Sequence, residues 1–305
     1  MTTRTNIFMN AVAAILFVVC VGLTLQSCGK TVHSDENGSV SVELVYADPE
    51  DKETVVIDDV KLWIFNDDGG LVGKYGYGKA SELGLQRFHL DDGRYLFVTA
   101  VNLEDPFTYS EITKATDVER LMFGLRLPAA SPGHAFYGVT EVLVKDEESS
   151  VVSSEIRRVL SELSIVMTGA PAGMRLDATV RCIASGIFPA IKGSDGGYGL
   201  PTKEEIVNIP LPVGTESEGT VTTPVMRLMP SFDGSLATLI HLTLTLADGS
   251  ILESDIVAPV MQSSGKYILT LRYTEMRAYM YVTSYKISDW VEGWVFNGEI
   301  LDPEE

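Results

Sequence analysis

The sequence predicts an all-β protein of sandwiches or barrels, and three observations support that fold class. Short segments in which apolar and polar residues alternate recur along the chain, as expected for half-buried strands. Several of these segments end at turn sequences, namely residues 66–70, 91–93 and 247–249. Only residues 109–123 have the spacing of an amphipathic helix. A chain with many strands and one short helix belongs to the all-β class.

Residues 1–27 predict a lipoprotein signal peptide. Arg4 precedes an apolar run from Ile7 to Leu25, which is typical of a secretory signal. Ser27 is a small residue of the kind that signal peptidases require before the cut, and Cys28 supplies a thiol that can carry lipid. We expect signal cleavage between Ser27 and Cys28 and lipidation of Cys28. The alternative is an uncleaved membrane helix, because roughly 20 apolar residues span a bilayer.

Removal of the signal peptide leaves residues 28–305, which is enough chain for two domains. This mature chain has 22 basic and 42 acidic residues, a net charge of −20. Because such a surface repels nucleic acid, we expect no nucleic-acid partner. Cys28 and Cys182 are its two cysteines. With Cys28 lipidated, Cys182 has no disulfide partner, and we expect it to be buried in a strand.

The first half of the mature chain predicts a tether and then a strand-rich domain. Residues 28–39 are polar and unpatterned, so we expect a flexible, lipidated tether. The N-terminal β-sandwich domain is expected over residues 40–160. Its first strand runs from Val40 to Tyr46, and its second runs from Val55 to Phe65 and ends at a hairpin turn. A further strand is expected from Arg94 to Val101.

One helix and one domain boundary are expected near the middle of the chain. Residues 109–123 predict a helix, because their apolar positions lie near a 3.6-residue period and Ser110 or Thr108 can cap it. Residues 155–167 have no strong turn signal, so one strand is expected to pass from the first domain into the second near residue 160.

The C-terminal β-sandwich domain is expected over residues 161–305. Residues 184–201 contain five glycines and two prolines and predict a long loop. Strands are expected over residues 236–246, 250–257 and 266–273, and a last one from residue 279 to residue 287.

The sequence offers little sign of catalysis. The four histidines are far apart, and no His-x-x-x-His, Cys-x-x-Cys or Gly-x-Ser-x-Gly motif is present. We therefore expect no enzyme activity, no catalytic residue, no metal ligand and no cofactor. Residues 263–266 contain Ser-x-x-Lys, but a plain turn is the favoured interpretation because its companion motifs are missing. The aromatic-rich segments 134–138 and 289–294 are interpreted as packing residues rather than sugar-stacking platforms.

These features together resemble the FimB-type fimbrial anchor subunits of Bacteroidetes, part of the fimbrillin superfamily. The likeness covers most of the mature chain. Its parts are Cys28 behind a lipoprotein signal, the hairpin of residues 59–72, the strand of residues 90–102, the segments 136–138 and 158–163, and the closing residues 287–290.

The resemblance implies two tandem transthyretin-like β-sandwich domains and a structural role without catalysis. It implies a location in the fimbrium at the outer membrane, held on the outer face by palmitate or another acyl chain at Cys28. The implied partners are fimbrial shaft or accessory subunits, with no small-molecule substrate. Subunits of this kind join by β-strand exchange, since an open sheet edge offers unpaired N–H and C=O groups.

The resemblance also bears on the kind of subunit. Shaft subunits of the superfamily lose their first strand to an arginine-directed protease. Here the loop of residues 47–53 contains Lys52 but no arginine, and the first arginine of the mature chain is Arg87. This favours an anchor that attaches fimbriae to the membrane, limits their length and keeps the strand of residues 40–46. The alternatives are a fimbrial shaft or tip precursor and a surface glycan-binding lipoprotein.

Overall fold

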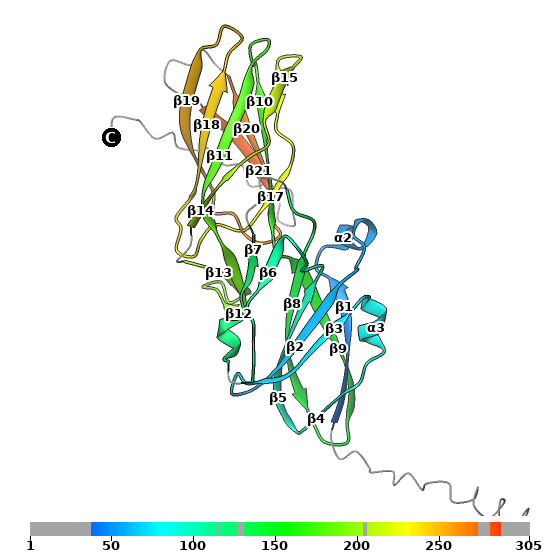
Figure 1. The fold of residues 1–305 in the computed structure, drawn as a ribbon. Helices are drawn as coiled ribbons and strands as arrows, with labels where there is room; N and C mark the ends of the chain where they lie inside the picture. Colours follow the sequence, from blue (N-terminus) through cyan, green and yellow to red (C-terminus); the bar gives the residue numbers. More distant parts are fainter. Residues whose placement is uncertain (1–37, 115, 127–130, 204–205, 274–280, 288–305) are drawn as a thin grey trace, which may run out of the picture.

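The computed structural model describes residues 38–114, 116–126, 131–203, 206–273 and 281–287. These residues form strands almost throughout, so the predicted all-β class is confirmed. Figure 1 shows an elongated molecule in which the strands before residue 160 lie at one end and most of those after it lie at the other. Ser27 and Cys28 lie outside the described residues.

The first half contains a sheet that folds back on itself. Its strand order is β3-β2-β5-β8-β9-β1-β4. Strands β8 and β9 pair only through Phe136 and Tyr137, so the sheet turns a corner there. The bounds are β1 (Gly38–Tyr46), β2 (Val60–Asn66), β3 (Leu71–Tyr77), β4 (Phe88–Leu90), β5 (Gly93–Val101), β8 (Phe136–Val144) and β9 (Ser149–Arg158). The second strand thus begins at Val60 and not at Val55 as predicted.

A hydrophobic core fills the space between the two arms of this sheet. It joins β1, β4 and β9 on one side to β2, β5 and β8 on the other. Val40 of β1, Leu62 of β2 and Ile156 of β9 are all fully buried in it. Two short helices, α2 (Pro49–Thr54) and α3 (Ala80–Gly84), follow β1 and β3.

A small third sheet covers the other face of β2 and β5. Its order is β13-β12-β7-β6, with bounds β6 (Phe107–Tyr109), β7 (Phe123–Leu125), β12 (Gly186–Lys192) and β13 (Tyr198–Pro201). Trp63 and Phe65 of β2 pack in a cluster with Phe123 of β7 and Ile187 of β12. Because residues 62–65 of β2 are buried on both faces of the sheet, this part of the strand is continuously apolar and does not alternate.

Two sequence predictions are wrong at this third sheet. The predicted loop of residues 184–201 contains β12 and β13, which pair with each other, and β12 also pairs with β7. The predicted helix of residues 109–123 is wrong, since Tyr109 of β6 pairs with Phe123 of β7, and the described residues between them form no helix longer than the 3-10 turn η1 (Val118–Arg120). Ser110, expected to cap the helix, instead donates to the Arg120 carbonyl and accepts from the Met122 N–H.

The second half forms a larger sheet whose main order is β19-β18-β11-β15-β16-β10-β20-β21, with β14 beside β11 and β17 beside β10. The expected alternation is confirmed in β18, where Ile240, Leu242 and Leu244 are buried and their neighbours are less so. The bounds are β10 (Ser161–Thr168), β11 (Arg175–Ala184), β14 (Ile206–Pro210), β15 (Gly214–Ser217), β16 (Thr220–Thr222), β17 (Met226–Leu228), β18 (Thr238–Thr245), β19 (Ile251–Ala258), β20 (Lys266–Arg272) and β21 (Tyr281–Ile287).

The chain crosses between the two halves at residues 159 and 160. The predicted continuous strand over residues 155–167 is two strands, β9 and β10, separated by buried Val159 and Leu160. One hydrophobic cluster contains both residues together with Trp63 of β2 and Ile165 of β10. The apolar packing is therefore continuous across the crossing.

Cys182 differs from its predicted burial. It is a free thiol in β11 and is only partly buried. Its φ of 68° and a shift in the pairing of β11 with β14 mark a β-bulge at this position.

Candidate functional site at the first strand

The first residues of strand β1, Gly38 to Val40, lie between two neighbouring strands. On one side it pairs in parallel with β9 from Ser39 to Tyr46, and on the other it pairs antiparallel with β4 from Gly38 to Val40. Val40 and Val42 place their side chains in the core. Removal of β1 would leave a groove with unpaired backbone groups and an uncovered core, which is the kind of site that another strand can fill.

The segment after β1 forms helix α2, although the sequence analysis treated it as a loop. Asp48 caps the helix by accepting a hydrogen bond of 2.9 Å from the Glu50 N–H. Pro49 follows at the first helical position, where its fixed φ favours a helix start. Lys52, the basic residue of this segment, is exposed on α2.

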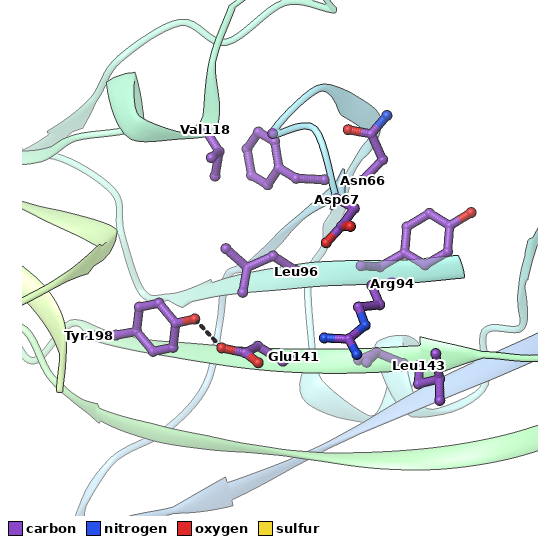
Figure 2. A pocket seen from close by; sticks show the side chains of 12 residues that line it. Asn66, Asp67, Arg94, Leu96, Val118, Glu141, Leu143 and Tyr198 are labelled. Carbon is purple, nitrogen blue, oxygen red and sulfur yellow. Dashed lines mark hydrogen bonds between the residues drawn. The ribbon is translucent and has the colours of Figure 1, made fainter. Parts of the chain in front are cut away.

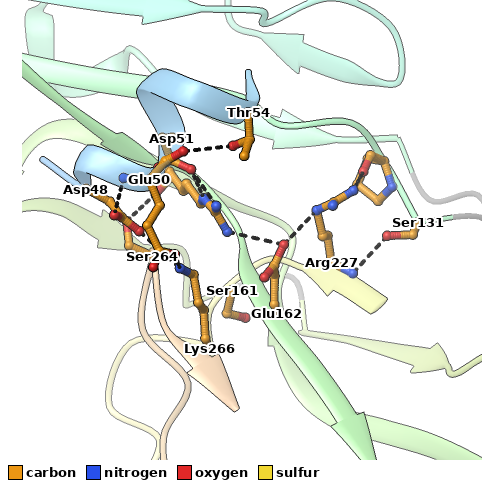
Figure 3. A network of polar contacts seen from close by, with 12 residues as sticks. Asp48, Glu50, Asp51, Thr54, Ser131, Ser161, Glu162, Arg227, Ser264 and Lys266 are labelled. Atoms are coloured by element: carbon orange, nitrogen blue, oxygen red, sulfur yellow. Dashed lines mark hydrogen bonds and ion pairs between the residues drawn. The ribbon is translucent and has the colours of Figure 1, made fainter. Parts of the chain in front are cut away.

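Ion pairs behind α2 connect it to both halves of the molecule (Figure 3). We call them the α2 network; its members are Asp48, Glu50, Asp51, Arg158, Glu162, Arg227 and Lys266. At its centre, Arg158 at the end of β9 donates to the carboxylate of Asp51, with an Nε–Oδ1 distance of 2.9 Å. The side chains of Asp51 and Arg158 are only 2% and 10% exposed. The pair is therefore largely removed from solvent.

The network continues from Arg158 into the second half. Nη1 of Arg158 lies 3.2 Å from Oε1 of Glu162 in β10, and the same oxygen accepts a hydrogen bond of 2.9 Å from Nε of Arg227 in β17. The Arg227 backbone N–H also donates to the hydroxyl of Ser131. The Glu162 carboxylate thus contacts one arginine from each of the two sheets, Arg158 from the first and Arg227 from the second.

Lys266 adds a second connection between α2 and the second half. Its Nζ lies 3.0 Å from Oδ2 of Asp48 and 3.2 Å from Oε2 of Glu50. Ser263 and Ser264 in the preceding turn donate to the carbonyls of Val159 and Arg158. The Ser-x-x-Lys sequence is therefore a turn, as predicted, and its side chains hold the crossing segment.

Electrostatics in the network favour the charged forms. Burial raises the pKa of Glu162, but the hydrogen bond from Arg227 and the charge of Arg158 outweigh it and hold the pKa below its ordinary value of 4.5. Burial likewise raises the pKa of Asp48, yet the Glu50 N–H and Lys266 bring it below 3.8. Burial lowers the pKa of Arg158, and Asp51 and Glu162 raise it by more. Asp48, Arg158 and Glu162 are thus ionised at neutral pH.

His134 lies beside this network, and its pKa is lowered first by burial and then by Arg227 and Arg158. It is therefore neutral at pH 7. Its neighbours Phe136 and Tyr137 are buried, so the packing interpretation of residues 134–138 is confirmed for these two rings. The other aromatic-rich segment, residues 289–294, lies outside the described residues.

The described residues do not assemble a group typical of an enzyme. His241 and Asp255 are 2.9 Å apart, but they lie on the exposed face of β18 and β19, and Asp255 also contacts Arg181. No three His, Cys, Asp or Glu side chains gather as metal ligands within the part of the chain that the structure places. In that same part, no helix is both long and apolar enough to cross a bilayer.

Comparison with known families identifies the chain. Residues 31–295 match the family Mfa2, described as fimbrillin-A associated anchor proteins Mfa1 and Mfa2. The chain belongs to this family. The predicted resemblance to fimbrial anchor proteins is therefore confirmed, and membership makes this chain a fimbria-associated protein of a structural family. A search of curated proteins found no match.

Solved structures give the same fold. The fimbrial anchor protein Mfa2 from Porphyromonas gingivalis is 13% identical, with a TM-score of 0.57 over 86% of this chain and 100% of that one. A candidate adhesin from Bacteroides ovatus is 14% identical, with a TM-score of 0.54 over 88% and 96% of the two chains. A candidate polysaccharide-binding protein from Bacteroides thetaiotaomicron is 13% identical, with a TM-score of 0.53 over 88% and 99%.

Proposed function

We propose that this Mfa2 family member is a lipid-anchored subunit that attaches fimbriae to the outer membrane and limits their length. In this proposal residues 1–27 are a signal peptide, residues 28–39 are a tether lipidated at Cys28, and residues 40–160 and 161–305 are two tandem β-sandwich domains. Neighbouring fimbrial subunits join by β-strand exchange.

One observation supports the proposal: β1 occupies the place beside β9 that a neighbour's strand would need, and ion pairs hold the following helix α2. A subunit whose groove is occupied has no place for a neighbour's strand, so it ends the fibre in that direction. The buried pair of Asp51 and Arg158 opposes departure of α2, and the surrounding loop has no arginine for an arginine-directed protease. Retention of β1 suits an anchor better than a shaft subunit.

Deletion of the gene tests the anchor role. We expect longer fimbriae that are released into the medium, because neither length control nor attachment remains. Fimbriae of unchanged length that stay on the cell would refute the proposal. Restoration of the gene on a plasmid is the control.

Substitution of the lipidation residue tests the tether. We expect Cys28→Ala to appear in the medium instead of the membrane fraction, while Cys182→Ala, the matched control, remains in the membrane. Retention of the Cys28→Ala protein in the membrane would contradict lipid anchoring. Mass spectrometry of the wild-type N-terminal peptide gives a direct measurement of acyl chains on Cys28.

The second candidate is a shaft or tip precursor, and the N-terminus of the surface-exposed protein distinguishes it. An anchor that keeps β1 begins at Cys28. A processed shaft subunit begins after the first strand, for example after Lys52.

A further inference from the structure

A cavity lined by residues of β5 and β8, the turn after β2, and Tyr198 has the properties of a ligand site (Figure 2). It has a volume of about 500 Å³, within the roughly 300–1,000 Å³ typical of small-molecule sites. Its floor is the outer face of β5 and β8, where Leu96 lies opposite Glu141 and Arg94 lies opposite Leu143. It contains none of the residues of the α2 network.

Both walls of the cavity are fixed by hydrogen bonds. On one side, the turn between β2 and β3 carries Asp67, and the Gly69 carbonyl of that turn accepts a hydrogen bond of 3.0 Å from the Val118 N–H. On the other side, the Tyr198 carbonyl of β13 accepts a hydrogen bond of 2.8 Å from the hydroxyl of buried Tyr137. A site with walls held in this way is formed before a ligand arrives.

The cavity lining carries charged side chains of both signs, namely Arg94, Asp67 and Glu141. Glu141 accepts hydrogen bonds through Oε1 from Tyr198 at 2.7 Å and from Lys192 at 3.0 Å. Nζ of Lys192 also lies 4.8 Å from the centre of the Tyr198 ring. Arg94 and Asp67 are exposed, and neither has an ion-pair partner within the described part of the chain. A bound molecule therefore meets one guanidinium, that of Arg94, and two carboxylates, one of which is already paired with Lys192.

This chemistry favours a neutral saccharide. A sugar ring has an apolar C–H face, which suits Leu96, Leu143 and the Tyr198 ring. Its hydroxyls both donate and accept, so they can use carboxylates and a guanidinium at the same time. An anionic ligand is disfavoured by the two carboxylates and by the acidic surface. A peptide strand finds no free edge in β5, since β2 and β8 pair with it on both sides.

We propose that this cavity binds a neutral oligosaccharide, with Arg94, Asp67 and Glu141 as its hydrogen-bonding groups. Asp67 and Glu141 accept from sugar hydroxyls, Arg94 donates to a hydroxyl or ring oxygen, and Tyr198 with the two leucines contacts the apolar face. This binding role is additional to fimbrial attachment and does not depend on it.

Calorimetric titration of the full-length protein in detergent tests the proposal. The probes are neutral tetrasaccharides of glucose, galactose, mannose, xylose and N-acetylglucosamine, with tri-galacturonate as the anionic comparison. We expect at least one neutral probe to bind. Arg94→Gln and Asp67→Asn should each weaken it about tenfold or more, because each removes a hydrogen bond to a charged group. Both side chains are exposed, so both variants should fold.

Arg157→Gln is the matched control, since Arg157 is an exposed arginine on β9 away from the cavity. The Arg157→Gln variant should bind the neutral probe with the same affinity as the wild type. Three results would overturn the proposal: no binding of any neutral probe, binding of tri-galacturonate alone, or neutral binding that the Arg94 and Asp67 substitutions leave unchanged.

Discussion

The substitution Arg158→Ala tests whether the α2 network holds the segment after the first strand. It removes the cation that contacts Asp51 and leaves that carboxylate 2% exposed without its ionic partner. Loss of one partner from a buried ion pair typically costs about 3–5 kcal/mol of unfolding free energy. For a protein of this size, the thermal midpoint should fall on the order of 10 °C.

A double-mutant cycle separates the ion pair from the rest of the network. Asp51→Ala should cost less than Arg158→Ala, because Arg158 keeps Glu162 at 3.2 Å. The double variant should be less destabilised than the sum of the single variants, since neither charge then remains buried alone. Thermal or urea unfolding monitored by circular dichroism measures the stability of the two single variants and the double variant.

Cleavage by a lysine-specific protease reports on α2 itself. Lys52 lies in α2, and a protease cuts it only when the helix opens. A loss of about 3 kcal/mol in local stability raises the open population on the order of 100-fold, so cleavage after Lys52 should accelerate accordingly. Mass spectrometry of the fragments identifies the cut.

Arg157→Ala provides the control, because Arg157 precedes Arg158 and pairs with Glu155 at 3.5 Å on the exposed face. An exposed pair contributes less than about 1 kcal/mol. If Arg157→Ala and Arg158→Ala give the same midpoint and the same rate of cleavage after Lys52, the network does not hold α2 and the reasoning fails.

Three further predictions concern other contacts. Burial raises the pKa of Tyr137 to about 12, so this residue makes stability fall as pH rises from 10 to 12. Tyr137→Phe should reduce that fall in alkaline unfolding curves, and an unchanged slope would contradict the prediction. Gly199→Ala should lower the free energy of unfolding by about 1–3 kcal/mol, because the new Cβ would lie 2.0 Å from the Tyr137 hydroxyl. An unchanged urea midpoint would be evidence against this contact. Glu162 has a lowered pKa, so its ionised form stabilises the fold above pH 4.5, and this stabilisation is lost as pH falls. The thermal midpoint of Glu162→Gln should therefore decline less steeply between about pH 5 and 3 than that of the wild type. Equal slopes for the two proteins would exclude this role.

The strands that could be predicted from sequence are those with one buried face. In β18, burial of every second residue produces the alternation that predicts a strand, and the turn of residues 247–249 marks its end. The turn of residues 66–70 was predicted for the same reason, and Gly69 there has a φ of 77°. Local patterns of this kind need no knowledge of distant partners.

The errors fell where distant contacts decide the structure. The glycines of residues 184–201 resemble a loop, but a Cβ at Gly186 would lie 2.5 Å from the Phe123 carbonyl oxygen. Glycine there permits close approach of strands β12 and β7. The predicted helix of residues 109–123 failed similarly, because pairing of β6 with β7 overrides a local 3.6-residue spacing.

The α2 network was missed because its charges are far apart in the sequence. Asp51 and Arg158 are separated by 107 positions, and each taken alone resembles a solvated surface charge. The sequence Asp48-Pro49 was a usable signal for a helix start, but nothing local indicates that Asp51 is buried. Ion pairs between distant residues require the fold before they can be recognised.

The geometry of β1 predicts how the proposed anchor resists the pull of a fibre. With lipid at Cys28, force enters the described chain at Gly38 and acts along β1. In this parallel pair the hydrogen bonds between the strands are slanted and evenly spaced, so the bonds to β9 from Ser39 to Tyr46 carry a pull along β1 together. The pair of Asp51 and Arg158 then ties the far end of this segment to β9.

Withdrawal of β1 towards the membrane must therefore break its register with β9 and the ion pair at nearly the same time. Single-molecule pulling between residue 38 and the second half should show a lower first unfolding force for Arg158→Ala than for wild type or Arg157→Ala. Equal forces would mean that β1 is held by its own strand pairing alone. In that case the ion pair would protect α2 from proteolysis without contributing to mechanical attachment.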